Sequence, residues 1–498
     1  MNSDRPISPA TTEITVGNAG HHFIDGAPYS PEAAQSFPLY NPNTGEVLTE
    51  VLDGTPCDVD YAVKSAKRVF ESAEWSGMRA VDREELLRDL ADVVERHVDA
   101  FVELEAMDVG MPASMAREVY GELTPSIIRY FAGWPTKGGG QIVDPGLFAP
   151  TELFTYTMRE PVGVVAAILP WNAPGDLAVW KAVPALAAGC TVVMKPSETA
   201  NLTASLLARL AMQVGFPKGA LNLVNGKGST TGAALVAHPD VAMVGFTGST
   251  ETGRKIQELA ARGPKRVQLE LGGKSPVIVM EDADLDSAAE MIADGIFSLS
   301  GQICVAGSRV YAQASIYENL VSRLAEAAKA RRLGPAQDDC TNMGPLVSAA
   351  QRDKVAGFVD RAVKDGATVL AGGQRPEGVG YFYPATVLTN VTNSMECVQQ
   401  EIFGPVVTVQ KIETEAEAIR LANDTAYGLA AYIWTRDIAR AHRLTRAIRA
   451  GKIAVNFIAP PIAALPEGGR GGSGFGRDLG KESLDQYFET KSVLFRTV

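Results

Sequence analysis

The chain has 498 residues, of which 46% are hydrophobic and 21% charged, and it carries a net charge of −12. This composition is typical of a folded soluble protein that is too long for one small core, so two or three lobes are expected. The acidic balance, with basic residues scattered among the acids, argues against nucleic acid as a partner because its phosphates would be repelled.

The cysteines and histidines indicate neither a disulfide framework nor a metal site. The five cysteines are widely spaced without a C-x-x-C pair, and the five histidines are not grouped at ligand spacing. The N-terminal MNSDRPISPATTE lacks the apolar segment of a signal peptide, and the longest apolar stretch, Val162 to Leu169, is too short to cross a bilayer. We therefore expect a cytoplasmic protein in a reducing compartment, with no metal and no membrane contact.

The first third of the chain predicts a surface arm followed by helices. The segment up to about Pro38 is polar and irregular, which favours the arm. Residues 56–109 show a helical pattern: Asp58 can cap one helix, and a long amphipathic run ends at Gly110. At residues 138–140 the composition shifts to glycine, and the following QIVD and LFTYTMREP suggest strands that could form a projecting hairpin.

After Pro161 the pattern predicts parallel sheets. The short apolar runs VGVVAAIL, TVVMK, LNLV, AMVGF and VQLEL alternate with helical stretches, which is typical of a sheet buried on both faces. A second region of the same kind runs from about Leu271 to Asn456, and the C-terminal KSVLFRTV predicts a last strand. Alone, that strand would present an exposed edge with which another subunit could pair.

Two glycine-containing turns between a strand and a helix are candidate phosphate sites. They contain Gly226-x-Gly228-x-x-x-Gly232 and Gly248-x-x-x-x-Gly253, and neither fits G-x-G-x-x-G. Glycine at a helix N-terminus allows a phosphate to approach the backbone N–H groups, but glycines also serve tight turns and helix packing. The pattern alone leaves both interpretations open.

The segment TVVMKPSET places charged residues at the end of a predicted strand. Parallel sheets bind ligands beyond the carboxyl ends of their strands, where Lys195 is expected, and Glu198 could accept hydrogen bonds from ribose hydroxyls. A solvated Lys/Glu pair is the alternative, and from this segment alone it is favoured.

Cys304 and Glu270 are the candidate nucleophile and base. Most free cysteines are inert and buried, which is our interpretation of Cys57, Cys190 and Cys397, but Cys304 has small polar neighbours that suit an approachable thiol. Glu270 lies among apolar residues in VQLELGG, where an acid is costly unless it is solvated or used. Spacing alone does not show that the two side chains face each other.

Seven stretches in chain order carry a resemblance to a known family: PWNAP, WKAVPALAAGCTVVMKPSE, FTGSTETG, LELGGKSP, GQICVAGSR, EIFGPV and GGSGFGRDLG. From about Tyr40 to the terminus the chain resembles the aldehyde dehydrogenase superfamily. The resemblance implies an α/β fold with a Rossmann-like parallel-sheet cofactor domain (residues 1–133 and 152–270) and a second α/β catalytic domain (271–481). It also implies a small β oligomerisation element (134–151 and 482–498), which would make a homodimer or homotetramer.

The resemblance also implies roles for individual residues. Cys304 matches the nucleophile, Glu270 the general base and Asn172 the donor to the oxyanion. The oriented backbone and Lys181, in the WK motif of the family, are two unranked candidates for raising the thiolate fraction. The implied cofactor contacts are Lys195 and Glu198 at the adenosine ribose, Glu401 and Phe403 at the nicotinamide ribose, Thr247, Gly248 and Ser249 beside the pyrophosphate, and in addition Trp171, Gly228 and Gly253. Since a carboxylate repels a 2′-phosphate, Glu198 favours NAD⁺ over NADP⁺.

The implied reaction is the NAD-dependent oxidation of an aldehyde to its carboxylic acid, through a hemithioacetal and a thioester on Cys304. Water activated by Glu270 would hydrolyse the thioester. One alternative is a CoA-acylating semialdehyde dehydrogenase, which the presence of Glu270 opposes. Another is a non-catalytic relative that binds nucleotide, which the intact set of matching residues opposes.

The chain departs from the family pattern where many relatives line the aldehyde tunnel with aromatic side chains. The positions concerned are Ala173, Ser298 and Glu467, and Asp176 and Trp180 are further candidates for the tunnel. One hypothesis is a wide, polar tunnel for a bulky or hydroxylated aldehyde, or less favoured, a positively charged one. The alternative is that Glu467 turns to solvent and selects nothing.

Overall fold

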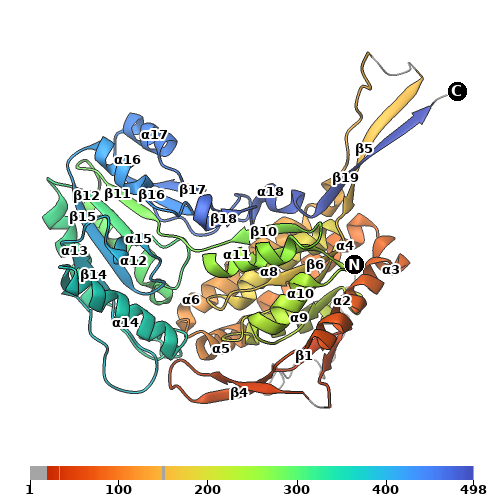
Figure 1. Cartoon of the computed structure of the whole chain (residues 1–498), viewed down its shortest axis with the longest axis horizontal. Coiled ribbons are helices and arrows are strands. Elements are labelled where there is room, and N and C mark those ends of the chain that lie inside the picture. The colour runs from red at the N-terminus through yellow and green to blue at the C-terminus, as the bar shows by residue number, and fades with distance from the viewer. Residues whose placement is uncertain (1–19, 33, 148–151, 497–498) are drawn as a thin grey trace.

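The computed structural model describes residues 20–32, 34–147 and 152–496. It contains two helix-covered sheets, one in each of two adjacent lobes, and a two-stranded ribbon that projects from the body (Figure 1). The predicted α/β fold with two sheet-containing regions is confirmed.

The first lobe contains an eight-stranded sheet in the order β18-β10-β9-β6-β7-β8-β1-β2. Its central strands are parallel: β6 (Val164–Ile168), β7 (Thr191–Lys195), β8 (Leu221–Leu223), β9 (Val241–Thr247) and β10 (Arg266–Glu270). The parallel part begins in the middle of the sheet at β6, proceeds through β7 to β8 on one side, and then returns to place β9 and β10 on the other side. In sheets of this order, ligands bind where the order reverses, here beyond the carboxyl ends of β6 and β9.

Helices cover both faces of this sheet. They include α2 (Pro56–Phe70), α4 (Ala80–Arg96), α5 (Val98–Asp108), α7 (Thr124–Ala132), α8 (Pro174–Ala188), α9 (Leu202–Gln213), α10 (Ala233–Ala237) and α11 (Thr250–Ala260). The prediction of one long helix that ends at Gly110 is wrong in one respect. The backbone leaves helical geometry at His97, which divides the helix into α4 and α5. No helix in the described ranges combines the length and apolar character needed to span a bilayer.

The second lobe contains a seven-stranded sheet in the order β13-β14-β15-β12-β11-β16-β17. Its strands are β11 (Pro276–Val279), β12 (Arg309–Gln313), β13 (Thr368–Ala371), β14 (Thr386–Thr389), β15 (Val406–Ile412), β16 (Ala430–Trp434) and β17 (Lys452–Val455). All pairs are parallel except that of the edge strand β13. Its helices include α12 (Leu285–Phe297), α13 (Tyr317–Lys329), α14 (Ala349–Lys364), α15 (Glu396–Gln399), α16 (Glu415–Asn423) and α17 (Ile438–Ala447).

The C-terminal segment returns to the first lobe earlier than predicted. β18 (Gly474–Phe475) pairs with β10, and α18 (Gly480–Asp485) packs on α8. The domain boundary predicted between residues 481 and 482 is therefore wrong, since residues 474–485 complete the first lobe. Pairing with β18 satisfies the backbone groups at the edge of β10.

The projecting ribbon consists of β5 (Leu153–Pro161) and β19 (Phe488–Arg496), antiparallel over nine residues each. The boundary at residue 152 is wrong too, because Leu153–Pro161 belongs to this ribbon and not to the cofactor lobe. The predicted QIVD strand is reduced to a bridge between Ile142 and Tyr156. Local pattern could not show that β5 pairs with a strand more than 300 residues away.

The predicted N-terminal arm lies partly outside the described residues. Its described part forms β1 (His22–Ile24), β2 (Ala27–Tyr29) and β3 (Ser36–Tyr40), and β3 pairs with β4 (Val47–Leu52). The prediction of an irregular arm is wrong for this part, because β1 pairs with β8 and extends the first sheet.

Candidate active site

A groove of about 660 Å³ lies beyond the carboxyl ends of β6, β7 and β9. Lys195 and Thr247 are the last residues of β7 and β9, and Trp171 follows β6. Seven of the ten predicted cofactor residues line this groove: Trp171, Lys195, Glu198, Gly228, Thr247, Gly248 and Ser249. The groove lies where the strand order reverses, which is the place expected for a nucleotide.

Lys195 and Glu198 form one wall of this groove. The Lys195 ammonium lies 3.7 Å from the Glu198 carboxylate, and it is buried whereas the Glu198 side chain is 48% exposed. Burial lowers the pKa of Lys195 to about 8. Glu198 accepts a hydrogen bond of 3.3 Å from the Gly228 N–H, so an exposed carboxylate lies beside a glycine backbone. The alternative of a fully solvated pair is wrong for Lys195.

The turn between β9 and α11 lines the groove and leads into a capped helix. Ser249 is the N-cap of α11 and accepts the Thr252 N–H at 3.2 Å. A Cβ atom added at Gly248 would lie 2.5 Å from the Phe246 ring. Gly253 differs from its predicted role as a cofactor contact, because it does not line the groove. A Cβ atom added at Gly253 would lie 2.5 Å from the Leu271 side chain, so close packing of the helix explains this glycine.

The residues predicted to lie near the nicotinamide come from both lobes and contact one another. Trp171 and Phe403 contact each other edge to face, with ring centroids 5.2 Å apart. The Glu401 carboxylate accepts the Gly273 N–H at 2.9 Å, and burial raises the pKa of Glu401. Phe403 has a φ of +57°, a conformation that non-glycine residues rarely adopt and that often marks a functional site.

The loop that carries Cys304 is held in an unusual conformation. Leu299, Ser300 and Gly301 have successive φ angles of +48°, +54° and +70°. A Cβ atom at Gly301 would lie 2.1 Å from the Gly404 carbonyl oxygen, so only glycine fits there. The buried Gln302 side chain accepts the Val347 N–H at 2.9 Å and donates to the Leu299 carbonyl at 3.1 Å. These contacts fix the backbone directly before the thiol.

Asn172 approaches the same loop from the first lobe. Its amide donates to the Gln302 carbonyl at 3.0 Å. The predicted oxyanion donor and nucleophile, 132 residues apart in the chain, are thereby brought to one place.

Glu270 is the last residue of β10, and its side chain is buried. Among the described residues, its Oε1 has no hydrogen-bond partner, and an added Cβ at Gly468 would lie 2.5 Å from that oxygen. Burial and the neighbouring Asp478 raise the pKa of Glu270 well above its ordinary value, an effect that Lys181 opposes. A carboxylate with an uncommitted oxygen and a raised pKa is suited to accept a proton.

The electrostatic surroundings of Cys304 are acidic. Burial raises the pKa of the thiol, and the carboxylates of Glu270, Glu401 and Glu467 raise it further. The expectation of an electropositive influence from Lys181 is wrong: its ammonium is bound to Asp478 at 2.7 Å and to Gln268 at 2.9 Å. Lys181 acts on the predicted base, Glu270, where it opposes the rise in pKa.

Comparison with known proteins identifies the family. The model of the aldehyde dehydrogenase family matches residues 29–493. The chain belongs to this family. It is 42% identical to cytosolic aldehyde dehydrogenase 1 of Mus musculus, over 97% of this chain and 94% of that protein.

Two solved structures from the family show how similar the fold is. The NAD⁺ complex of aldehyde dehydrogenase from Bacillus cereus has a TM-score of 0.93 and 42% identity, with 96% of each chain covered. Betaine aldehyde dehydrogenase from Staphylococcus aureus in complex with NAD⁺ also has a TM-score of 0.93, at 40% identity, with 96% of this chain and 95% of that chain covered.

The predicted tunnel residues of this family member divide into two groups. Ala173, Trp180 and Ser298 are partly exposed. Asp176 does not lie at an open mouth: it is buried, accepts the Thr124 hydroxyl at 2.7 Å, and has a pKa raised by burial to about 6. Glu467 is also buried, in an ion pair with Lys452, so the alternative that it turns to solvent is wrong. Both acids are engaged by side chains of the protein, which weakens the hypothesis of a polar tunnel.

Three further residues at the site were missed from the sequence. Gln302 lies in the quoted stretch GQICVAGSR and Asp478 in GGSGFGRDLG, so the family motifs could have indicated both. Lys452 lies in no quoted motif, and its contact with Glu467 depends on the tertiary structure.

Proposed function

We propose that this enzyme oxidises an aldehyde to a carboxylic acid with NAD⁺, through a thioester on Cys304. The observation that carries the proposal is the meeting of Cys304, Glu270 and Asn172 between the two lobes, beside the groove that could hold a dinucleotide. The Glu270 carboxylate is near enough to change the pKa of the thiol, and the Asn172 amide contacts the loop that holds it.

The first step is addition of the Cys304 sulfur to the carbonyl carbon. The thiol proton leaves to solvent water, and the carbonyl oxygen becomes an oxyanion. Asn172 has two amide hydrogens; the bond to Gln302 fixes the amide and uses one, so the other is available to the oxyanion. One such donor typically lowers the barrier by about 3 kcal/mol.

The residues of the groove fit a dinucleotide. Glu198 and Lys195 would hold the adenosine ribose, the Thr247–Ser249 turn the pyrophosphate, and Glu401 and Phe403 the nicotinamide ribose. When bound, NAD⁺ accepts the hydride that the oxyanion expels. Collapse of the oxyanion leaves an acyl group on Cys304, and Glu270 then takes a proton from the water that hydrolyses this thioester.

The function is tested by following NADH or NADPH absorbance with short alkyl, branched, aromatic and amino aldehydes. We expect activity with NAD⁺ to exceed that with NADP⁺, because the exposed Glu198 carboxylate would repel a 2′-phosphate. A clear preference for acetaldehyde would contradict a wide tunnel. Absence of activity with every aldehyde and both cofactors would favour a non-catalytic relative.

Product analysis with and without CoA separates hydrolysis from acyl transfer. We expect the free carboxylic acid in both cases, because Glu270 is present and its Oε1 is uncommitted among the described residues. Formation of acyl-CoA would indicate the CoA-acylating reaction instead.

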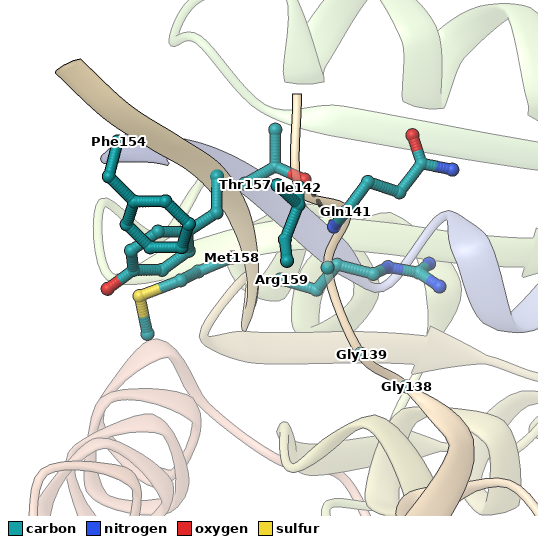
Figure 2. A pocket seen from close by; sticks show the side chains of 10 residues that line it. Gly138, Gly139, Gln141, Ile142, Phe154, Thr157, Met158 and Arg159 are labelled. Atoms are coloured by element: carbon teal, nitrogen blue, oxygen red, sulfur yellow. Dashed lines mark hydrogen bonds between the residues drawn. The ribbon is translucent and has the colours of Figure 1, made fainter. Parts of the chain in front are cut away.

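We also infer that the ribbon forms a homo-oligomer, a dimer or a tetramer. Phe154, Tyr156 and Phe495 form an aromatic cluster on it, in which Phe154 is 44% and Phe495 54% exposed. A groove of about 500 Å³ lies along β5 between this strand and residues 138–142. Figure 2 shows Phe154 and Met158 among the side chains that line it. Within the described residues, β19 pairs only with β5, so its other edge can accept a strand.

Replacing both Phe154 and Phe495 by aspartate is expected to produce monomers in size-exclusion chromatography with light scattering. The charges would oppose burial of this surface. Val379→Asp is the matched control, because Val379 is 77% exposed but lies in the second lobe. An unchanged mass of the double variant would contradict the inference.

A cytoplasmic location is consistent with this proposal. Cys190 and Cys397 are buried free thiols as predicted, but the predicted burial of Cys57 is wrong, because Cys57 is an exposed free thiol, as is Cys340. Such cysteines persist most readily in a reducing compartment.

A further inference from the structure

Lys452 and Glu467 form a buried ion pair that the proposed reaction does not use. Lys452 is the first residue of β17, and its Nζ contacts the Glu467 Oε1. The two side chains are 14% and 7% exposed. The same ammonium lies 3.4 Å from the Ala459 carbonyl oxygen and 3.3 Å from that of Pro460. Lys452 therefore ties the segment 459–467 to the second sheet.

The segment that carries Glu467 contacts the candidate base. The Glu467 backbone pairs with that of Asp478 through hydrogen bonds of 2.7 and 2.8 Å. The next residue, Gly468, has a φ of +153°, and a Cβ added to it would lie 2.5 Å from the Glu270 Oε1. A shift of this segment would therefore move the wall against which Glu270 rests.

The charges around the catalytic pair are predominantly negative. Glu270, Glu401 and Glu467 act on Cys304, and Asp478 and Glu467 act on Glu270, where Lys181 and Arg477 oppose them. Lys181 is bound to Asp478, and Arg477 donates to the Gly469 carbonyl at 3.1 Å. Lys452 is the cation in contact with Glu467, and it opposes the rise in the pKa of Glu467 that burial causes.

We propose that Lys452 is a positioning residue for the reaction: it offsets the charge of Glu467 beside Cys304 and Glu270, and it holds the segment that borders Glu270. The inference rests on the proposed function, because it assigns a role toward the thiol and base of that reaction. It also accounts for a buried glutamate at a position where many relatives have an aromatic side chain. The acid is retained as half of a neutral pair and does not bind substrate.

The proposal is tested by the alkylation rate of Cys304 with iodoacetamide, measured against pH by mass spectrometry of the full-length enzyme. Below the pKa of the thiol, this rate follows the thiolate fraction. Lys452→Met leaves the Glu467 carboxylate without its counter-charge, so its negative charge acts on Cys304 unopposed. An additional nearby negative charge typically raises a pKa by about one unit, so alkylation at a given pH should slow about tenfold.

Three further variants provide the matched controls. Glu467→Gln removes the negative charge and should make alkylation faster than in the wild type, and the double variant Lys452→Met/Glu467→Gln should return it to near the wild-type rate. Lys411→Met removes an exposed lysine from β15 of the same sheet and should change nothing. The exposed Cys57 and Cys340 serve as internal references in every sample.

Equal slowing in Lys452→Met and in the double variant would overturn the proposal, because loss of packing alone would then explain both. An unchanged rate in Glu467→Gln would overturn it as well, and this variant decides the matter should Lys452→Met not fold. Because the measurement needs no aldehyde and no cofactor, its failure is distinguishable from failure of the proposed function. Failure of the proposed function would instead appear as a wild-type protein that does not oxidise aldehydes.

Discussion

Replacement of Cys304 by alanine is expected to reduce aldehyde-dependent NADH formation by about 10⁴-fold or more. Without the sulfur, no hemithioacetal forms, and the aldehyde carbon stays too electron-poor to release hydride. The cofactor groove lies beyond the first sheet and is lined by other residues, so NAD⁺ affinity should be little changed. Steady-state kinetics with a saturating aldehyde, together with NAD⁺ titration by fluorescence, provides both measurements.

The matched controls are the other accessible cysteines. Cys57 and Cys340 are exposed, and alanine at either position should leave activity unchanged. Should Cys304→Ala retain more than a few per cent of wild-type turnover, the thioester mechanism would be wrong.

Replacement of Glu270 by glutamine is expected to separate the two halves of the reaction. Glutamine preserves the shape of the side chain but cannot take a proton from water, so hydrolysis of the thioester should slow by about 10²–10⁴-fold. Reduction of the cofactor in the first turnover should be affected less. Stopped-flow absorbance should therefore show a burst of about one NADH per active site, and intact mass spectrometry should show the acyl adduct on Cys304.

The pH dependence of the wild type provides a second test of Glu270. Because burial and Asp478 raise its pKa, this carboxyl remains protonated to a higher pH than an ordinary glutamate. The basic form then becomes more abundant as pH increases, so the hydrolysis rate should rise through the raised pKa and level off above it. Glu270→Gln should lose this dependence. An identical pH profile in the variant, or steady turnover without a burst, would assign the base to another group.

The parts of the site that lie on local motifs were predictable. The apolar run before Lys195 predicts the strand that Lys195 ends. Cys304 lies in a turn of small residues, and this turn is part of GQICVAGSR, one of the stretches that match the family. The parallel sheets follow from alternating apolar and helical segments. These features depend on neighbouring residues in the chain, and such patterns are the strongest signals a single sequence carries.

The parts that depend on long-range contacts were not predictable. The sequence predicts Lys181 as a cation for the thiol, but the distant Asp478 binds it, and its charge acts on Glu270. Asp176 looked like an acid of the tunnel, but it is buried against Thr124. Lys452 was not noticed, because nothing near it in the chain reveals that it neutralises Glu467. Which charge a side chain contacts is a property of the tertiary structure.

The return of the chain end to the first lobe has a consequence for biosynthesis. β18 covers the edge of β10, and Leu479, Leu484 and Tyr487 are part of the same apolar core as α8 and β7. A segment translated about 200 residues after β10 is thus needed to finish the lobe that contains β10. Until residues 474–487 have left the ribosome, part of that core faces water, and messages truncated shortly before residue 474 would yield polypeptides prone to aggregation and proteolysis.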